Sequence, residues 1–359
     1  MHEVQQVAPC FLLSNSTGCA IWVPRVQVMS TLVDEYLSWM EFNNGRSVAT
    51  CDKYGRYLNQ LAAALKVKGK TLRMANLEDL LQFAGIDAFE RKMAASTRRT
   101  MVAAIRGFYE WLYKRREIST NPAAAMPYPK AGKKLPIAMS LSALEQILRQ
   151  PDLETFIGVR DLTIMMIMAG CGPRVSGVVG LNQSDLISYS DQAGQHLVIR
   201  FREKGKKERL VPAPHETRLI LHAYLNHPEL DGIDRSLPNG DQVLFVSTRN
   251  RLTAAHEYHG EARRLSQRSA QDRIQHYGEA AGIPKDQMHP HALRHLFGAE
   301  LAEEDVGIDL RQVLLGHEDP KTSVIYSHIA HRKLRAIIDA ANPLGKINTP
   351  TTALLEALK

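Results

Sequence analysis

The sequence predicts a mainly α-helical protein of two domains, in which the second domain also carries a small antiparallel sheet. Apolar residues recur at helical spacing from about residue 28 to residue 118, without any strand pattern. A segment rich in proline and lysine then interrupts the periodicity at 121–139. Further along, two short β-like stretches flank a glycine-containing turn near residue 205. A chain of 359 residues is long enough for two such domains.

Composition favours an ordinary globular protein with a polyanionic partner. The hydrophobic fraction of 44% and the charged fraction of 23% are typical of globular chains, and the net charge is +7. No uncharged apolar run has the length of a membrane-spanning helix, and no basic stretch precedes the apolar residues of a signal peptide, so we expect no membrane partner. The cysteines form no CxxC pair, which predicts reduced thiols in a cytoplasmic protein: Cys10, Cys19, Cys51 and Cys171.

The first domain is predicted to be a bundle of four helices over residues 28–125, after a lead-in at 1–27 without regular period. Its last helix, "STRRTMVAAIRGFYEWLYKRR", has one apolar face. Arg98, Arg99 and Arg106 lie on the other side of this helix. Two interpretations stay open at this point: a solvated helix face, or a helix placed against phosphate groups.

A basic, proline-rich linker is predicted at 126–137, and it includes Lys133 and Lys134. The second domain then begins with the helix "LSALEQIL", for which Ser142 and Glu145 predict a capping box. Its next helix contains "DLTIMMIMAG", which is too apolar for a surface helix and is expected to pass through the core.

The β interruption of the second domain, which we place at 138–342, is predicted to be a hairpin. The stretches "QHLVIRF" and "ERLVPA" alternate as strands do, and "REKGKK" lies between them. Lys204 would be at the tip of this hairpin, with Lys206 and Lys207 beside it.

Residues 289–295 read "HPHALRH" and concentrate titratable groups. Either His289, His291 and His295 bind a metal ion, or His291 and Arg294 bind a phosphate. The metal site lacks nearby acidic ligands, and the His-Glu-x-x-His pattern is absent. On a helix, by contrast, the spacing of His291 and Arg294 places both on one side. We therefore expect no metal here.

Other residues that can bind phosphate or attack it are spread along the second domain in a recognisable order. Arg174 lies in "GCGPRVSG", Lys204 in "EKGKKER", His317 in "LLGH" and Tyr326 in "TSVIYSHI". With the His-x-x-Arg pair between them, this set resembles the tyrosine recombinase (phage integrase) family, in particular its Xer-like branch. The resemblance covers roughly residues 30–340 and is strongest in "HALRHLFGAELAEEDVGIDLRQVLLGHEDPKTSVIYSHI".

The resemblance implies a two-domain clamp around duplex DNA, with a helical core-binding domain and a catalytic domain. Tyr326 would attack a phosphodiester and form a 3′-phosphotyrosyl bond, without any cofactor. Arg174 and Arg294 would hold the non-bridging oxygens. The family pattern also assigns proton transfer to Lys204 and His291, and a hydrogen bond to the phosphate to His317.

The resemblance further implies how such an enzyme works with its partners. Four protomers would assemble as a homotetramer on two double-stranded DNA sites and exchange strands through a Holliday junction, to integrate, excise or resolve DNA elements. An accessory DNA-bending or directionality factor is a possible partner, and the enzyme would be cytoplasmic and associated with the nucleoid. The basic residues predicted to contact DNA are Arg98, Arg99, Arg106, Lys133, Lys134, Lys206 and Lys207.

Gly177 is a departure from the family pattern, because an acidic residue usually follows the first arginine by three positions. Three alternatives therefore stay open: a non-catalytic DNA-binding protein on the same fold, a relaxing enzyme like type IB topoisomerases, and, least favoured, a metallohydrolase. The tail at 343–359 is predicted to form a short helix after Thr349, with a stripe made of Leu354, Leu355 and Leu358. We expect this helix to pack on a neighbouring protomer; the alternatives are that it folds back on its own domain or that the tail is disordered.

Overall fold

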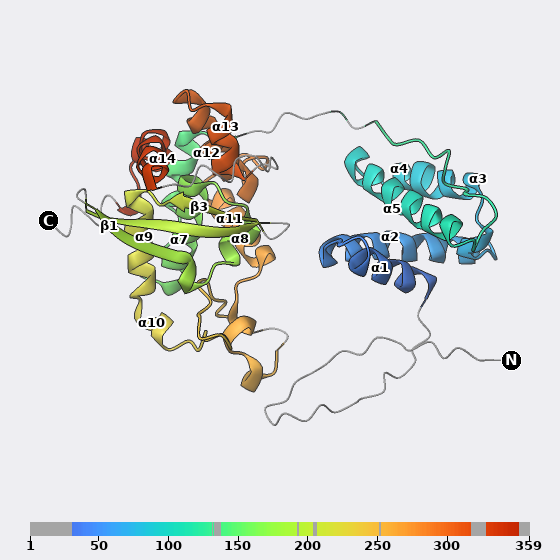
Figure 1. Ribbon diagram of the computed structural model, residues 1–359, viewed down its shortest axis with the longest axis horizontal. Coiled ribbons are helices and arrows are strands. Elements are labelled where there is room, and N and C mark those ends of the chain that lie inside the picture. Colours follow the sequence, from blue (N-terminus) through green and yellow to red (C-terminus); the bar gives the residue numbers. More distant parts are fainter. Residues whose placement is uncertain are drawn as a thin grey trace. The chain divides into compact units, whose positions relative to one another are not determined.

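The computed structural model describes residues 31–130, 132, 138–191, 194–203, 207–250, 253–316 and 328–351. The chain divides into two compact units, one up to Lys134 and one from Leu135 onward (Figure 1). Each unit has its own hydrophobic core. Among the described residues, no helix is both long and apolar enough to cross a membrane.

The first unit is helical throughout its described part. Its elements are α1 (Leu32–Phe42), α2 (Val48–Val67), η1 (Leu72–Met74), α3 (Leu77–Leu81), the π-helical η2 (Gln82–Asp87), α4 (Ala88–Glu90) and α5 (Ala95–Lys114). Helix α1 begins with a capping box, in which the Thr31 hydroxyl accepts from the Asp34 amide at 3.2 Å and the Asp34 carboxylate accepts from the Thr31 amide at 2.9 Å. Since α3, η2 and α4 follow one another without a break, the unit has the four helical segments that the periodicity predicts.

Helix α5 supplies much of the core of this unit. The apolar face predicted from the sequence is buried, with Met101, Ile105 and Phe108 inaccessible to solvent. Ala123 and Met126 are buried in the same core, so the chain stays packed against the first unit until it reaches the proline-rich segment.

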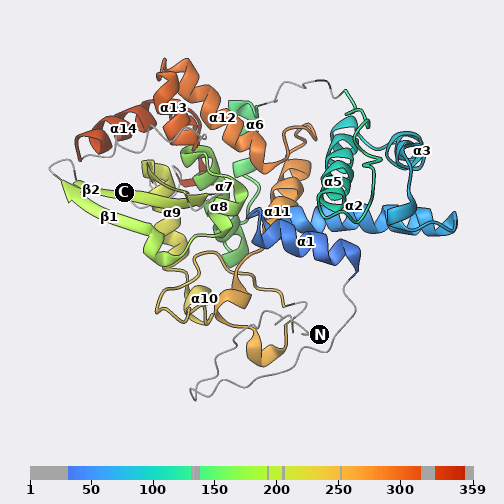
Figure 2. The same ribbon diagram turned by 45° about the vertical axis from the view of Figure 1, so that its right-hand side comes forward.

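The second unit combines helices with one three-stranded antiparallel sheet of order β1-β2-β3 (Figure 2). The strands are β1 (Leu186–Asp191), β2 (Gly194–Glu203) and β3 (Lys207–Pro212). The helices are α6 (Leu141–Leu148), α7 (Phe156–Cys171), α8 (Val175–Val179), α9 (His215–Leu225), α10 (Pro228–Asp231), α11 (Gln267–Ala280), α12 (Pro290–Glu303), α13 (Ile308–Leu315) and α14 (His328–Ala341), with short 3-10 turns η3 (Gln183–Asp185), η4 (Ala255–Glu257), η5 (Gly260–Arg263) and η7 (Pro343–Lys346).

Helix α7 passes through the centre of the second unit, as its apolar sequence predicts. All its residues except Ile157 are buried. It packs against α6, α8, α9, α11 and α12, while α13 and α14 contact β3. The C-terminal ends of α7 and α13 lie beside the sheet, where Arg209 of β3 donates to the carbonyls of Cys171 and Leu314.

Two local predictions are corrected. Ser142 and Glu145 form no capping box: helix α6 is capped by Ser140, whose hydroxyl accepts from the Ala143 amide at 3.1 Å, and Glu145 instead pairs with Arg149 at 2.5 Å. The cap belongs to the residue before the first helical turn, and that residue is Ser140. Strand β1 was not predicted either, because the serines of "LISYSD" weaken the strand pattern.

Candidate active site

The stretch "HPHALRH" forms the beginning of helix α12. His289 is its N-cap, and its Nδ1 accepts a hydrogen bond from the Ala292 amide at 3.0 Å. Pro290 follows at the first helical position, where a missing amide hydrogen costs nothing. Since His289 fixes where the helix begins, its position is explained without any reaction role.

His291 and His295 lie one turn apart on the exposed side of α12, with ring centroids 6.4 Å apart. Partial burial lowers the pKa of His291, and the nearby His295, His289, Arg294 and Arg174 lower it further. Burial, His289 and Arg294 likewise lower the pKa of His295. Both rings are therefore neutral at neutral pH and able to accept a proton. Within the described ranges, no three His, Cys, Asp or Glu residues gather as metal ligands do.

Arg294 is buried, with 7% of its surface exposed. Its guanidinium donates to the Gly172 carbonyl at 2.6 Å and to the Leu315 carbonyl, which joins α12 to the ends of α7 and α13. Burial and the neighbouring Arg209 and Arg174 lower its pKa to about 9, so the group stays charged at neutral pH. A buried cation among other cations favours the binding of an anion beside it.

Arg174 stands at the N-cap position of α8, in an extended backbone conformation and half-buried. It follows the turn at Gly172, where the chain leaves α7 with a φ of +60°. A Cβ at Gly172 would lie 2.2 Å from Cδ1 of Phe297 on α12, so glycine permits both the left-handed turn and the close packing of the two helices. The fold thus brings Arg174 within electrostatic range of His291 and Arg294.

Gly177, where the family has an acidic residue, is buried on α8. A Cβ there would lie 3.8 Å from both Cδ1 of Phe201 and Cβ of Pro173, which is ordinary van der Waals contact. Neither the backbone conformation nor the space requires glycine at this position. The missing carboxylate is therefore not explained by the backbone conformation or by the space around the Cβ position.

Three predicted catalytic residues, Lys204, His317 and Tyr326, lie outside the described residues. The hairpin that was predicted to carry Lys204 is confirmed by the pairing of Glu203 with Lys207 across β2 and β3. In the chain, His317 directly follows Gly316, the left-handed C-cap of α13, and Tyr326 precedes α14 by two residues.

The predicted DNA-binding arginines of α5 are engaged with aromatic rings. The guanidinium carbons of Arg99 and Arg106 lie 5.0 and 5.2 Å from the ring centroid of Tyr128, and Arg106 also donates to the Met126 carbonyl at 2.6 Å. Arg98 lies over Phe89 at 5.3 Å. Of the predicted lysines, Lys133, Lys134 and Lys206 lie outside the described residues, and Lys207 is placed only by its backbone at the start of β3.

Two residues that sequence reasoning missed stand out beside these groups. Tyr128 joins the start of the proline-rich segment to α5, and its only trace in the sequence is an aromatic residue between two prolines. Arg209 is 4% exposed, lies with its guanidinium carbon 5.0 Å from the Phe201 ring centroid, and donates to the carbonyls of Cys171 and Leu314. The sequence signal that could have found Arg209 is its place in a strand, at a position whose side chain points inward.

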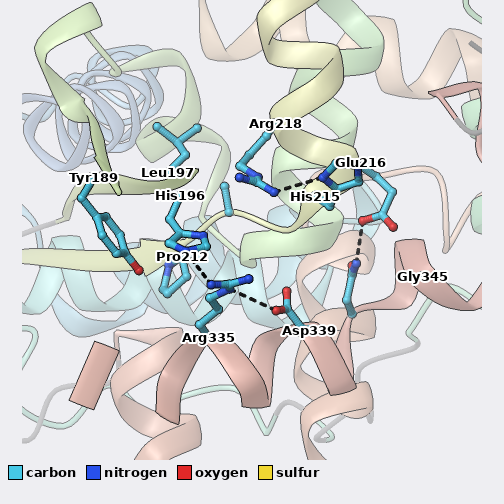
Figure 3. A pocket seen from close by; sticks show the side chains of 12 residues that line it. Tyr189, His196, Leu197, Pro212, His215, Glu216, Arg218, Arg335, Asp339 and Gly345 are labelled. Carbon is cyan, nitrogen blue, oxygen red and sulfur yellow. Dashed lines mark hydrogen bonds and ion pairs between the residues drawn. The ribbon is translucent and has the colours of Figure 1, made fainter. Parts of the chain in front are cut away.

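Helix α14, which follows the Tyr326 segment in the chain, is attached to the sheet beside a cavity of about 230 Å³ (Figure 3). Nη1 of Arg335 lies 2.7 Å from Nε2 of His196 on β2, and Nε of the same arginine lies 3.4 Å from the Asp339 carboxylate. At the other end of the cavity, Asn342 donates to the Glu216 carboxylate of α9 at 3.0 Å. These contacts hold the end of α14 at a fixed place on the second unit.

Comparison with known families decides the classification. Residues 139–333 match the profile described as the phage integrase family, and residues 33–116 match its N-terminal SAM-like domain. The chain belongs to the phage integrase family. Tyrosine recombinase XerC of Syntrophus aciditrophicus is 30% identical over 328 residues, which is 89% of this chain and 99% of that protein. Tyrosine recombinase XerD of Proteus mirabilis is 29% identical over 316 residues, with 88% and 93% covered.

Solved structures agree on the fold. The recombinase XerH bound to a palindromic difH substrate, in a post-cleavage complex, superposes with a TM-score of 0.60 at 18% identity over 85% of this chain and 83% of that one. A lambda integrase tetramer bound to a Holliday junction gives 0.58 at 15% identity, with 82% and 80% covered. The chain is thus a site-specific tyrosine recombinase of the Xer type, an enzyme that cleaves and rejoins DNA, and this is favoured over the three alternatives.

Proposed function

We propose that the enzyme cleaves DNA by attack of the Tyr326 hydroxyl on a phosphodiester, with the groups around α12 stabilising the reaction. The observation that carries this proposal is the proximity of Arg174, Arg294 and His291 at the turn after α7 and the start of α12. Attack forms a 3′-phosphotyrosyl bond and releases the 5′ oxygen. A 5′ hydroxyl of another strand then reverses the step and regenerates the tyrosine, so no external energy source is needed.

The roles follow from charge and protonation. Arg174 and Arg294 bind the non-bridging oxygens of the pentacoordinate phosphate, whose charge grows during the attack. His291 is neutral in the free enzyme, so it accepts the proton of the Tyr326 hydroxyl. Lys204 donates a proton to the leaving 5′ oxygen, and His317 donates a hydrogen bond to the phosphate. These two assignments come from the order of the motifs in the chain.

DNA is held by both units in this proposal. The exposed guanidinium of Arg99 and the half-buried one of Arg106 face outward from α5 and contact backbone phosphates, together with the lysines of the linker and of the hairpin. The working form is a homotetramer on two synapsed sites in the nucleoid, with an accessory DNA-bending or directionality factor where the biological task requires one. Support comes from the lambda integrase tetramer on a Holliday junction, which shares the fold.

The tail contributes to this assembly only beyond residue 351. Lys346 pairs with Glu300 and Glu304 of α12 at 2.8 Å each, and Thr349 and Thr351 are buried in the second unit. The leucine stripe lies outside the described residues, and we assign it to a neighbouring protomer. A chain ending at Thr351 keeps the packed residues, so it should bind one DNA site normally and fail to join two sites in native gel electrophoresis. Normal synapsis by that chain would contradict the assignment.

Replacement of Tyr326 by phenylalanine tests the cleavage proposal. Tyr326→Phe should form no SDS-resistant adduct with a nicked DNA substrate, whereas its affinity for the same DNA should be unchanged, because no phosphate-neutralising charge is lost. Tyr113→Phe, which removes an exposed hydroxyl from α5, is the control and should form the adduct normally. An adduct formed by the Tyr326→Phe enzyme would show that another residue is the nucleophile.

A further inference from the structure

Two buried arginines from different elements bind the same pair of helix ends. Arg209 of β3 donates to the carbonyls of Cys171 and Leu314. Arg294 of α12 donates to the next carbonyl at each end, those of Gly172 and Leu315. The C-terminal turns of α7 and α13 are therefore joined through two guanidinium groups.

The helix ends supply what these buried cations need. The last carbonyls of a helix lack intrahelical partners and carry the negative end of the helix dipole. Both α7 and α13 end in a glycine of left-handed conformation, so the backbone turns sharply after each helix. The last carbonyls of each helix are thereby accessible to the arginines. Four hydrogen bonds and two favourable dipoles offset the cost of burying Arg209 and Arg294, which are only 4% and 7% exposed.

Each element joined in this way leads to a residue of the proposed site. The chain leaving α7 reaches Arg174 two residues after Gly172, and the chain leaving α13 reaches His317 directly after Gly316. Strand β3, which carries Arg209, begins three residues after Lys204. A displacement of either helix end would therefore move a group that contacts the phosphate.

Charge and packing point to the same residue. Arg209 is the foremost charged group that lowers the pKa of Arg294, so the two guanidiniums are close neighbours. Phe201, which lies under the Arg209 guanidinium, is also, with Pro173, one of the two side chains nearest to a Cβ at Gly177, where the family has its acidic residue. In this enzyme the support behind the phosphate-binding arginines thus includes a cation stacked on an aromatic ring and held by carbonyl groups.

We propose that Arg209 is a positioning residue for DNA cleavage, which aligns Arg174 and Arg294 by holding the ends of α7 and α13 together. This inference rests on the proposed function of those two arginines. Arg209 itself is buried behind them and contacts no DNA in this proposal. Its loss should consequently slow the chemical step and leave the affinity for DNA unchanged.

The test compares Arg209→Met and Arg209→Lys in single-turnover cleavage of a nicked substrate, at saturating enzyme. Because a misplacement of about 1 Å can cost roughly 100-fold in rate, Arg209→Met should cleave about 100-fold more slowly, with an unchanged Kd for the single site. Arg209→Lys keeps the charge but loses the planar group that lies over the Phe201 ring and reaches less far toward the two carbonyls, so we expect an intermediate rate, about 10-fold below that of the unmodified enzyme.

Arg160→Met is the matched control. Arg160 is also 4% exposed, and it binds Asp161 and the Val246 carbonyl far along α7 from the site. This variant should lose thermal stability and still cleave at the normal rate at a temperature where it is folded. Cleavage by Arg160→Met that is as slow as that of Arg209→Met would mean that stability alone explains the effect, and would overturn the proposal.

Two further outcomes distinguish a failure of the Arg209 proposal from a failure of the proposed cleavage reaction. If Arg209→Met does not fold, Arg209→Lys decides: a folded Lys variant that cleaves at the normal rate overturns the positioning role. If the Tyr326→Phe enzyme still forms an adduct, the proposed reaction fails whatever the Arg209 variants do. A slow Arg209 variant with normal DNA affinity, beside an inactive Tyr326→Phe, is the result we expect.

Discussion

Two pairs of arginines, one in each unit, are held by different kinds of contact. Arg209 and Arg294 of the second unit are buried, and backbone carbonyls at two helix ends determine their orientation. Arg99 and Arg106 of the first unit both lie against one aromatic ring, that of Tyr128, which is itself 42% exposed. The pair in the second unit is fixed by the fold, whereas Arg99 is held by a surface contact and Arg106 by that contact and a hydrogen bond to the Met126 carbonyl.

The difference suits the proposed roles, in which Arg294 binds the reacting phosphate and Arg99 binds a backbone phosphate. A cation–π contact at an exposed site contributes about 0.5–1 kcal/mol, so an arginine held in this way can adjust to a phosphate at little cost. A buried guanidinium with carbonyl partners cannot move without leaving polar groups unpaired, which costs about 1–3 kcal/mol for each group. Chemistry requires the fixed arrangement, because developing charge must find its partners already in place.

The sharpest way to break this comparison is to replace a fixed arginine by lysine. Arg294→Lys keeps the charge but loses the planar fork that bridges two carbonyls and, in the proposed reaction, binds the phosphate. Removing one such donor from a transition state costs on the order of 10²–10³ in rate, and we expect a loss of that size in single-turnover cleavage. The same change at Arg99 should leave the rate at saturating DNA unchanged. Equal effects at the two positions would mean that fixation does not matter.

The rigidity of the second unit is tested at Gly172. In Gly172→Ala the new methyl meets Phe297 and the residue must keep a positive φ, so the free energy of unfolding should fall by roughly 2–5 kcal/mol. Gly282→Ala is the control, since its φ is +67° with no atom within 4 Å of the added Cβ, and strain alone should cost about 1–2 kcal/mol. Chemical denaturation measures both, and equal losses would exclude the contribution of the Phe297 contact.

The sequence predicts the secondary-structure elements of this site better than the side-chain contacts between them. The apolar run of α7, the hairpin of β2 and β3 and the start of α12 follow from periodicity and turn residues, because those signals are local. The candidates Arg174, His291 and Arg294 come from the order of motifs in the chain.

Long-range contacts account for what could not be predicted. The carbonyls that Arg209 and Arg294 bind lie 38 and 122 positions away at the end of α7, and no spacing in the sequence relates a side chain to such a partner. The sequence likewise did not predict that His289 caps a helix or that two arginines contact the Tyr128 ring. A histidine before a proline and a tyrosine flanked by prolines occur in many environments. Ser140 and not Ser142 caps α6, because the helix begins two residues earlier than predicted.

Arg99 and Arg106 should influence the affinity for DNA and leave the reaction rate unchanged. Arg99→Ala removes one of the proposed phosphate contacts, so the slope of log Kd against log salt concentration should become shallower by about 0.9, with a severalfold weaker Kd. Tyr128→Ala should weaken binding less, because both guanidiniums keep their charge, and Tyr128→Phe, which keeps the ring, should have no effect. Binding is measured by fluorescence anisotropy at several salt concentrations. An unchanged salt slope in Arg99→Ala would remove α5 from the DNA interface.

The smallest effect concerns how Arg174 acts on the pKa of His291. Because Arg174 is one of the groups that lower the pKa of His291, Arg174→Gln should raise that pKa toward its usual value, as followed by NMR titration of the ring in the free enzyme. Arg268→Gln, which removes an exposed charge paired with Asp272 on α11, is the control and should leave the titration unchanged.

The lowered pKa of His291 also makes the free energy of unfolding depend on pH. The folded-state pKa of His291 lies below the value of about 6.5 for an unfolded chain, so above pH 6.5 the ring is neutral in both states and costs nothing. As the pH falls through 6.5, the unfolded chain takes up the proton first, and the free energy of unfolding decreases until the pH passes below the folded-state pKa. His291→Gln should therefore lose part of this acid sensitivity. If instead the acid sensitivity persists unchanged in His291→Gln, and Arg174→Gln does not move the titration, the cations of the second unit do not act on this ring.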